Sequence, residues 1–144
     1  MTAIQPVFGS QRQKRIPIAM DSGTKVLVVE DDDSMREAME RLLNAAGFTT
    51  AVYASAEELL AVGAVGGDAC VVSDLKLPAM SGLELLAQLR GHSWQGPLIL
   101  ITAHDSPSVR KAAQQSGVAG YLAKPFLGST LLAAIRTAIG TTKP

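Results

Sequence analysis

The chain has 144 residues, of which 47% are hydrophobic, so it has the size of one globular domain with a largely aliphatic core. Its 13 basic and 13 acidic residues cancel, which argues against the positive excess typical of nucleic-acid-binding proteins. The single cysteine excludes an intramolecular disulfide, and no apolar stretch approaches the ~20 residues that cross a bilayer. The apolar stretch near the N-terminus is too short for a secretion signal, so we expect a cytoplasmic protein without membrane contact.

The first 24 residues differ from the rest of the chain. They mix Gln, Pro, Ser, Gly and basic residues without a helical or strand period, which is typical of a flexible extension. From residue 25 onward, short apolar runs alternate with amphipathic stretches. We therefore expect an extension over residues 1–24, one folded domain over residues 25–140 and a short tail over residues 141–144.

Five apolar runs predict buried strands, because they are short, rich in Val, Ile and Leu, and separated by helical patterns and turn residues. They are residues 25–30, 49–54, 69–74, 97–103 and 120–124. The third run, ACVVSD, ends at Asp74, and Pro78 then prevents its continuation. Cys70 lies inside this run and is expected to be a small buried side chain.

Helices are predicted after these strands from Leu, Met, Ile and Ala residues at spacings of three and four. Serine–glutamate pairs predict capping boxes at three helix starts: Ser34 with Glu37, Ser55 with Glu58, and Ser81 with Glu84. Pro107 behind Ser106 predicts the start of the fourth helix, which should end near Gly117. Strict alternation of strand and helix predicts a parallel sheet covered by helices on both faces.

Charged and hydroxyl side chains stand where four of the predicted strands end: Glu30 and Asp31, Asp74, Thr102, and Lys124. Parallel strands end at one edge of a sheet, where open α/β sheets bind their ligands. Three convergent carboxylates repel one another unless a cation neutralises them, and such oxygen ligands suit Mg²⁺. A lysine and a hydroxyl beside them suit a phosphoryl group, which a carboxylate can accept as an aspartyl phosphate.

Four motifs together make residues 25–140 resemble the receiver domain of bacterial two-component response regulators. They are VVEDD after the first strand, SDLKLPAMSGLELL around Asp74, ITA at the fourth strand end and GYLAKPF at the fifth. The resemblance implies a flavodoxin-like, doubly wound five-stranded parallel sheet in the order 2-1-3-4-5, and a cis peptide bond between Lys124 and Pro125. The ITAHD and KPF segments are most similar to receivers that precede DNA-binding output domains, so we expect either a single-domain regulator or a receiver cut from a longer protein.

The same resemblance implies roles for the strand-end residues. Asp74 would be the phosphoacceptor. Asp31, Asp74 and the backbone carbonyl of Lys76 would bind Mg²⁺ directly, while Glu30 would act mainly through water.

The remaining residues would read the phosphoryl group and report it. Thr102 and Lys124 would contact the phosphoryl oxygens, and Tyr121 matches the aromatic switch position. The signal would leave through the face formed by the fourth helix, the fifth strand and the fifth helix. Basic candidates for a partner surface on that face are Arg110, Lys111 and Arg136.

The function implied is a phosphorylation-activated signalling switch rather than an enzyme. A sensor histidine kinase would donate the phosphoryl group, and the chain's own activities would be Mg²⁺-dependent self-phosphorylation and self-dephosphorylation. The output partner would be another protein or an output domain missing from this chain, and a phosphorylation-dependent dimer is a further option. This domain itself is not expected to bind nucleic acid.

Two other classes use a related fold or chemistry. A haloacid-dehalogenase-like phosphatase also combines Asp, Mg²⁺, Thr or Ser, and Lys, but it needs an Asp-x-Asp motif, and Lys76 stands two residues after Asp74. A flavin-binding module would need a phosphate-cradling loop after the first strand, where the acidic EDDD would instead repel a phosphate. Turnover of small phosphate esters would identify the phosphatase, and a coloured purified protein would identify the flavin-binding module.

Overall fold

The computed structural model of the chain describes residues 24–63, 65–66 and 69–142. The predicted extension, apart from Thr24, lies outside the described residues, and so do residues 143–144 of the predicted tail. Within the part of the chain that the structure describes, no helix has both the length and the apolar character needed to cross a membrane.

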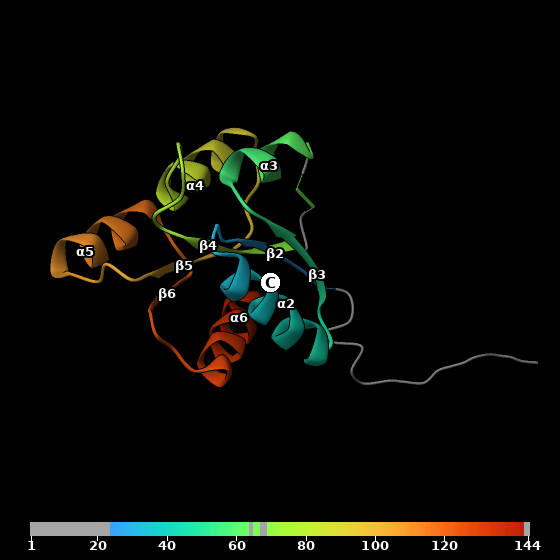
Figure 1. Cartoon of the computed structure of the whole chain (residues 1–144). Coiled ribbons are helices and arrows are strands. Elements are labelled where there is room, and N and C mark those ends of the chain that lie inside the picture. The colour runs from blue at the N-terminus through green and yellow to red at the C-terminus, as the bar shows by residue number, and fades with distance from the viewer. Residues whose placement is uncertain (1–23, 64, 67–68, 143–144) are drawn as a thin grey trace, which may run out of the picture.

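A parallel sheet of five strands forms the middle layer of the molecule (Figure 1). Its strands are β2 (Lys25–Val29), β3 (Thr49–Tyr53), β4 (Ala69–Asp74), β5 (Leu98–Thr102) and β6 (Gly120–Ala123). They lie side by side in the order β3-β2-β4-β5-β6, and every neighbouring pair is parallel. Counted along the chain this order is 2-1-3-4-5, so the predicted flavodoxin-like fold is confirmed. The predicted cis peptide bond between Lys124 and Pro125 is also present.

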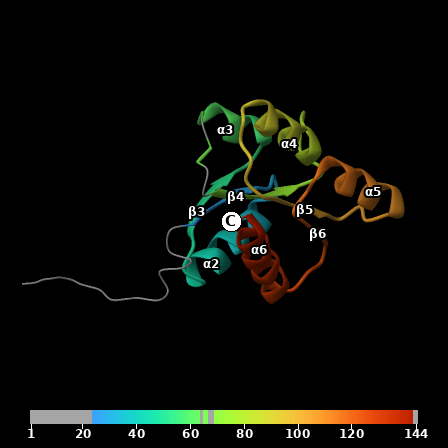
Figure 2. The ribbon, with the colours of Figure 1, turned by 180° about the vertical axis from the view of Figure 1, so that it is seen from behind.

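Helices cover both faces of the sheet (Figures 1 and 2). On one face lie α3 (Ala56–Ala61), α4 (Gly82–Gly91) and α5 (Pro107–Ser116). On the other face lie α2 (Asp33–Ala45) and α6 (Gly128–Thr142). The result is the three-layer arrangement that strand–helix alternation predicts.

Two hydrophobic cores result, because successive strand side chains point to opposite faces. Under α3, α4 and α5, the strands contribute Leu27, Val29, Val71, Leu98 and Leu100. Above α2 and α6, they contribute Val26, Val28, Cys70, Val72, Ile99 and Ile101. Cys70 is fully buried, which confirms the prediction of a small buried side chain, and burial raises the pKa of its thiol to about 12.

The helix starts test the predicted capping pairs. Ser81 and Glu84 form both halves of a capping box, and Ser106 caps α5 with Pro107 as its first residue. Ser55 caps α3, but the Glu58 carboxylate accepts a hydrogen bond from the Ala54 amide instead of the Ser55 amide. The start of α3 is therefore capped by Ser55 but lacks the second hydrogen bond of a capping box.

The capping box predicted at Ser34 and Glu37 is wrong. The α2 helix begins at Asp33, and its N-cap is Asp32, whose Oδ1 accepts a hydrogen bond from the Met35 amide at 2.9 Å. An aspartate caps as well as a serine, and its charge is also favoured at the positive end of the helix dipole. The helix therefore starts two residues earlier than predicted, directly after the acidic end of β2.

Candidate functional site

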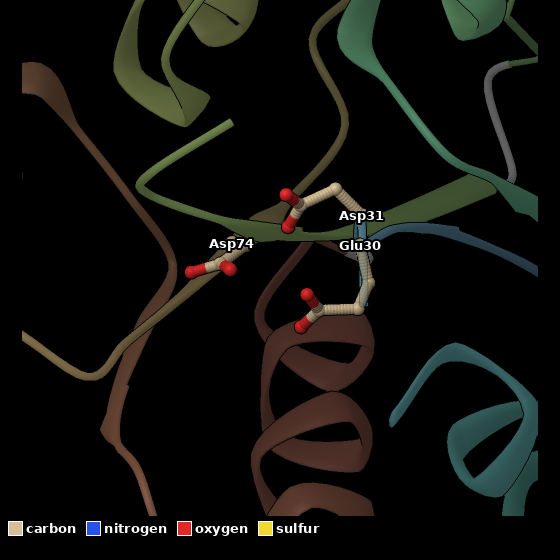
Figure 3. Close-up of side chains that lie close together, drawn as sticks. All are labelled: Glu30, Asp31 and Asp74. Atoms are coloured by element: carbon tan, nitrogen blue, oxygen red, sulfur yellow. The ribbon is translucent and has the colours of Figure 1, made fainter. Parts of the chain in front are cut away.

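Three carboxylates converge at the carboxyl edge of the sheet. Glu30 and Asp31 follow β2, and Asp74 ends β4. One carboxylate oxygen from each residue lies within 4.8 Å of the others, and Figure 3 shows the three groups projecting into the same region. Glu30 and Asp74 are buried, whereas Asp31 is exposed. We call Glu30, Asp31 and Asp74 the acid cluster.

The topology of the sheet brings this cluster together. β2 pairs with β3 on one side and with β4 on the other, so the chain connections diverge between β2 and β4. Ligands of open α/β sheets bind in the crevice at such a topological switch point. The register aligns Val29 with Ser73, so the residues that follow them reach the edge together.

Lys124 directly follows β6, the edge strand of the sheet, and connects that strand to the acid cluster. Its Nζ donates to Glu30 Oε1 at 2.9 Å and to Asp74 Oδ2 at 3.1 Å. Burial lowers the pKa of Lys124, but the hydrogen bonds and charges of the two carboxylates outweigh it, so the pKa is raised. The ammonium therefore stays charged at neutral pH. It opposes three carboxylates, and the site keeps an excess of negative charge.

Glu30 is held from three directions. Its Oε2 accepts from the Asp32 amide at 3.1 Å, its Oε1 accepts from Lys124, and its backbone carbonyl accepts from Arg36 Nη1 at 2.8 Å. Burial raises the pKa of the Glu30 carboxyl, aided by the Asp74 charge, although the bonds from Lys124 and the Asp32 amide oppose this. Sequence reasoning missed Arg36, because an arginine in the first turns of a helix gives no signal that it reaches back to a strand-end carbonyl.

Thr102 and Lys76 are also predicted at this edge, and they differ in burial. Thr102 ends β5 with no exposed surface, and its Oγ1 accepts a hydrogen bond from the His104 amide at 2.9 Å. Its hydroxyl thus holds the start of its own loop. Lys76 lies two residues beyond Asp74 with an exposed side chain.

Tyr121 is turned toward the loop between β5 and α5. Its hydroxyl donates to Asp105 Oδ1 at 2.8 Å, and the Arg110 guanidinium lies 5.0 Å from the centre of its ring. Arg110 also donates to both oxygens of Asp105, at 2.9 and 3.0 Å. Arg110, predicted as a partner-facing charge, therefore already has two partners inside the domain. Sequence reasoning missed Asp105, whose contact with Tyr121 joins residues 16 positions apart.

The backbone around Asp74 is tightly enclosed. The buried Ser73 hydroxyl donates to the Asp74 carbonyl at 2.9 Å, and the Gly82 amide donates to the Leu75 carbonyl at 2.9 Å. A Cβ added at Gly82 would lie 2.4 Å from the Asp74 carbonyl oxygen and 2.9 Å from Leu100 Cδ1. Only glycine fits the first position of α4 without moving the strand end that carries Asp74.

Gly82→Ala is therefore expected to lower the free energy of unfolding by about 1–3 kcal/mol, the usual effect of overpacking a rigid core. Gly91→Ala is the matched control, because a Cβ there has nothing within 4 Å and lies in the same helix. Alanine at that helical position should be neutral or stabilising by up to about 1 kcal/mol. Urea unfolding of both variants measures the difference, and equal stabilities would contradict the close contact at Asp74.

The donor set of the acid cluster fits a hard divalent cation. Three carboxylates within reach of one another, one of them open to solvent, match the few protein oxygens and several waters that Mg²⁺ prefers. The negative excess that remains after pairing with Lys124 provides the charge complementarity such an ion requires.

Comparison with known proteins adds an independent observation. Residues 26–136 match the family described as response regulator receiver domain. The chain is 33% identical over 121 residues to the transcriptional regulatory protein FixJ of Azorhizobium caulinodans, covering 84% of this chain and 57% of that protein. It is 37% identical over 120 residues to the response regulator MprA of Mycobacterium tuberculosis, covering 83% of this chain and 52% of that one.

A solved structure shows the same arrangement. The crystal structure of FixJ-N superposes with a TM-score of 0.75 at 31% sequence identity, covering 81% of this chain and 94% of that one. This chain spans about half the length of the two curated relatives. The matches to receiver domains, with Lys76 where a dehalogenase-like phosphatase carries an acid, leave that alternative without support.

Proposed function

Because this chain belongs to the response regulator receiver domains, the phosphorylation-activated switches of two-component signalling, we propose that Asp74 is its phosphoacceptor. The observation that carries this proposal is the position of the Asp74 carboxylate. It lies at the topological switch point of the sheet, in contact with Lys124 and within reach of Glu30 and Asp31. The family is one of signalling regulators rather than ordinary enzymes.

The proposed reaction is transfer of a phosphoryl group from a phosphohistidine of a sensor kinase. An ionised oxygen of Asp74 forms the new bond to phosphorus, the P–N bond breaks, and the histidine nitrogen takes the electron pair. Water then attacks phosphorus, the bond to the Asp74 oxygen breaks, inorganic phosphate leaves, and Asp74 returns to its carboxylate form. Both steps would be the chain's own self-phosphorylation and self-dephosphorylation activities.

The protein groups around Asp74 support this role by their charges. The Lys124 ammonium, already 3.1 Å from Asp74 Oδ2, would bind a phosphoryl oxygen once the acyl phosphate forms. Thr102, at the adjacent strand end, would donate its hydroxyl proton to another oxygen, a proton that the bond accepted from the His104 amide does not use. Both residues balance the charge that transfer brings to the site.

Asp31 and Asp74, with the Lys76 carbonyl, would hold Mg²⁺, and Glu30 would contribute through water. When bound, the ion supplies positive charge against the phosphoryl oxygens and the acid cluster. The fixed position of Glu30 supports its indirect role, because Lys124 and the Asp32 amide already occupy both carboxylate oxygens.

The proposed output follows from Thr102 and Tyr121. Phosphorylation would draw Thr102 toward the acyl phosphate, open space beside it and let the Tyr121 ring turn inward. The partners would be a sensor histidine kinase and either an output protein or an output domain of a longer chain, with phosphorylation-dependent dimerisation as one form of output. Residues 25–140 would be the receiver unit, flanked by residues 1–24 and 141–144.

Metal dependence tests the proposed site. Intact-mass measurement after incubation with acetyl phosphate should show one added phosphoryl group when Mg²⁺ is present and none when it has been removed with a chelator. The reason is that the negative excess of the acid cluster repels an anionic donor unless a cation offsets it. Equal uptake with and without metal would contradict the Mg²⁺ site while leaving Asp74 open as acceptor.

A further inference from the structure

Three residues outside the acid cluster form a closed set of contacts around Tyr121. The Tyr121 hydroxyl and the Arg110 Nε both donate to Asp105 Oδ1, Arg110 Nη2 donates to Asp105 Oδ2, and the guanidinium lies over the Tyr121 ring. We call Asp105, Arg110 and Tyr121 the Tyr121 clasp. Each of these three side chains contacts the other two, so the position of each depends on both of the others.

The pKa values agree with a clasp in which the carboxylate is ionised. The hydrogen bond from Arg110, and then that from Tyr121, lowers the pKa of Asp105. Burial, and then the hydrogen bond to Asp105, raises the pKa of the Tyr121 phenol. At neutral pH the phenol is therefore a donor to a charged acceptor, which makes a shorter and stronger hydrogen bond than a neutral pair.

The clasp is joined to Thr102 by a short loop. Asp105 stands three residues after Thr102 and directly before Ser106, whose side chain caps α5. The first loop contact is the bond from the His104 amide to Thr102 Oγ1. α5 fixes one end of this loop, and only two residues separate Thr102 from Asp105. A movement of Thr102 should therefore also displace Asp105.

Thr102 and Tyr121 also share one face of the sheet. The β5–β6 register pairs Leu100 with Tyr121 and Thr102 with Ala123, and side chains two residues apart in a strand point the same way. Tyr121 packs at the margin of the core that contains Leu100, beneath α4 and α5. An inward turn of its ring toward Thr102 would thus take the hydroxyl away from Asp105 and the ring away from Arg110.

We infer that the Tyr121 clasp is a latch, in which Asp105 and Arg110 hold Tyr121 outward and so set how readily this domain switches. The inference rests on the proposed Thr102–Tyr121 switch and adds two residues to it. A contact made only in the resting state lowers the apparent affinity for anything that binds the switched state. Removing that contact should raise the apparent affinity by the same factor.

The test measures how much beryllofluoride, a stable mimic of the phosphoryl group, is needed for half-occupancy of Asp74. The bound mimic is followed by fluorine NMR with saturating Mg²⁺ at about 0.15 M salt, where exposed charges are screened beyond ~8 Å. Asp105→Ala and Arg110→Met should each lower the half-saturating concentration about three- to tenfold, the range expected for losing an exposed ion pair with its cation–π contact. Lys111→Met is the matched control, since it removes the same charge from the next, exposed position of α5 and should leave the value unchanged.

The two latch variants separate a latch from a simple electrostatic effect. Asp105→Ala removes a negative charge and Arg110→Met a positive one, so a field effect on the anionic mimic would move their affinities in opposite directions. A latch predicts the same direction for both. The double variant should then gain little over either single one, because the two residues act in one set of contacts.

The outcomes also distinguish this inference from the proposed function. If wild type binds the mimic, Asp74→Asn does not, and both latch variants match wild type or need more mimic, the latch is refuted and the phosphoacceptor assignment stands. If wild type does not bind the mimic, the proposed function fails and the latch with it. Thermal unfolding of each variant shows that it is folded, which we expect because Asp105 and Arg110 are exposed.

Discussion

Asp74→Asn should abolish uptake of a phosphoryl group from acetyl phosphate, so that the intact mass stays unchanged under conditions where wild type gains one group. The amide has the shape of the carboxylate but carries no anionic oxygen that could form the acyl phosphate. The variant should still fold, because the oxygen of the introduced amide can accept the Lys124 hydrogen bond and the substitution removes one repelling charge beside Glu30.

Asp33→Asn is the matched control for this experiment. Asp33 lies in the acidic segment that also holds Glu30 and Asp31, but its side chain is 82% exposed and it pairs with Arg36 in the first turn of α2. Its substitution should leave phosphoryl uptake within about twofold of wild type, since exposed pairs of this kind contribute little. Undiminished uptake by Asp74→Asn would move the acceptor to another residue and overturn the assignment.

Much of the site could be predicted because it depends on where strands end. The buried run that finishes at Asp74, and the break at Pro78, define a strand end without knowledge of the fold. Parallel topology then brings the ends of β2, β4, β5 and β6 to one edge, whichever order the strands take. The sequence alone did not reveal that order, and it came only from the resemblance to receivers.

The residues that could not be predicted act through contacts that no local pattern records. Arg36 reaches the Glu30 carbonyl across the start of a helix that begins two residues before its predicted start. Asp105 and Tyr121 meet only because β6 lies beside β5 and runs parallel to it, back toward the edge where Asp105 stands. Such contacts follow from tertiary packing. The short-range spacing rules that predict caps and strands cannot predict them.

Thr102 ends β5 beside the strand that carries Asp74, and the loop that follows it reaches Asp105 of the Tyr121 clasp within three residues. In the resting structure its Oγ1 accepts from the His104 amide, so the hydroxyl oxygen stabilises the loop conformation that presents Asp105 to Tyr121. A phosphoryl group on Asp74 would offer a charged acceptor to the Thr102 hydroxyl proton, which the bond from the His104 amide does not use. Charge-assisted hydrogen bonds are stronger than neutral ones, so phosphorylation would favour the loop conformation that satisfies it.

Thr102→Ala should therefore uncouple phosphorylation from the response of the loop. Its Asp74 still accepts a phosphoryl group, but the change in amide hydrogen exchange over residues 103–123 that beryllofluoride induces in wild type should be largely lost. Thr102→Ser is the matched control, because it keeps the hydroxyl and should retain most of that change. Both variants should unfold at slightly lower temperature, with Thr102→Ala losing about 1 kcal/mol for the part-buried hydrogen bond that the His104 amide donates to Thr102. Exchange changes of equal size in wild type and Thr102→Ala, with beryllofluoride bound to both, would show that the signal leaves Asp74 by a path that does not include the Thr102 hydroxyl.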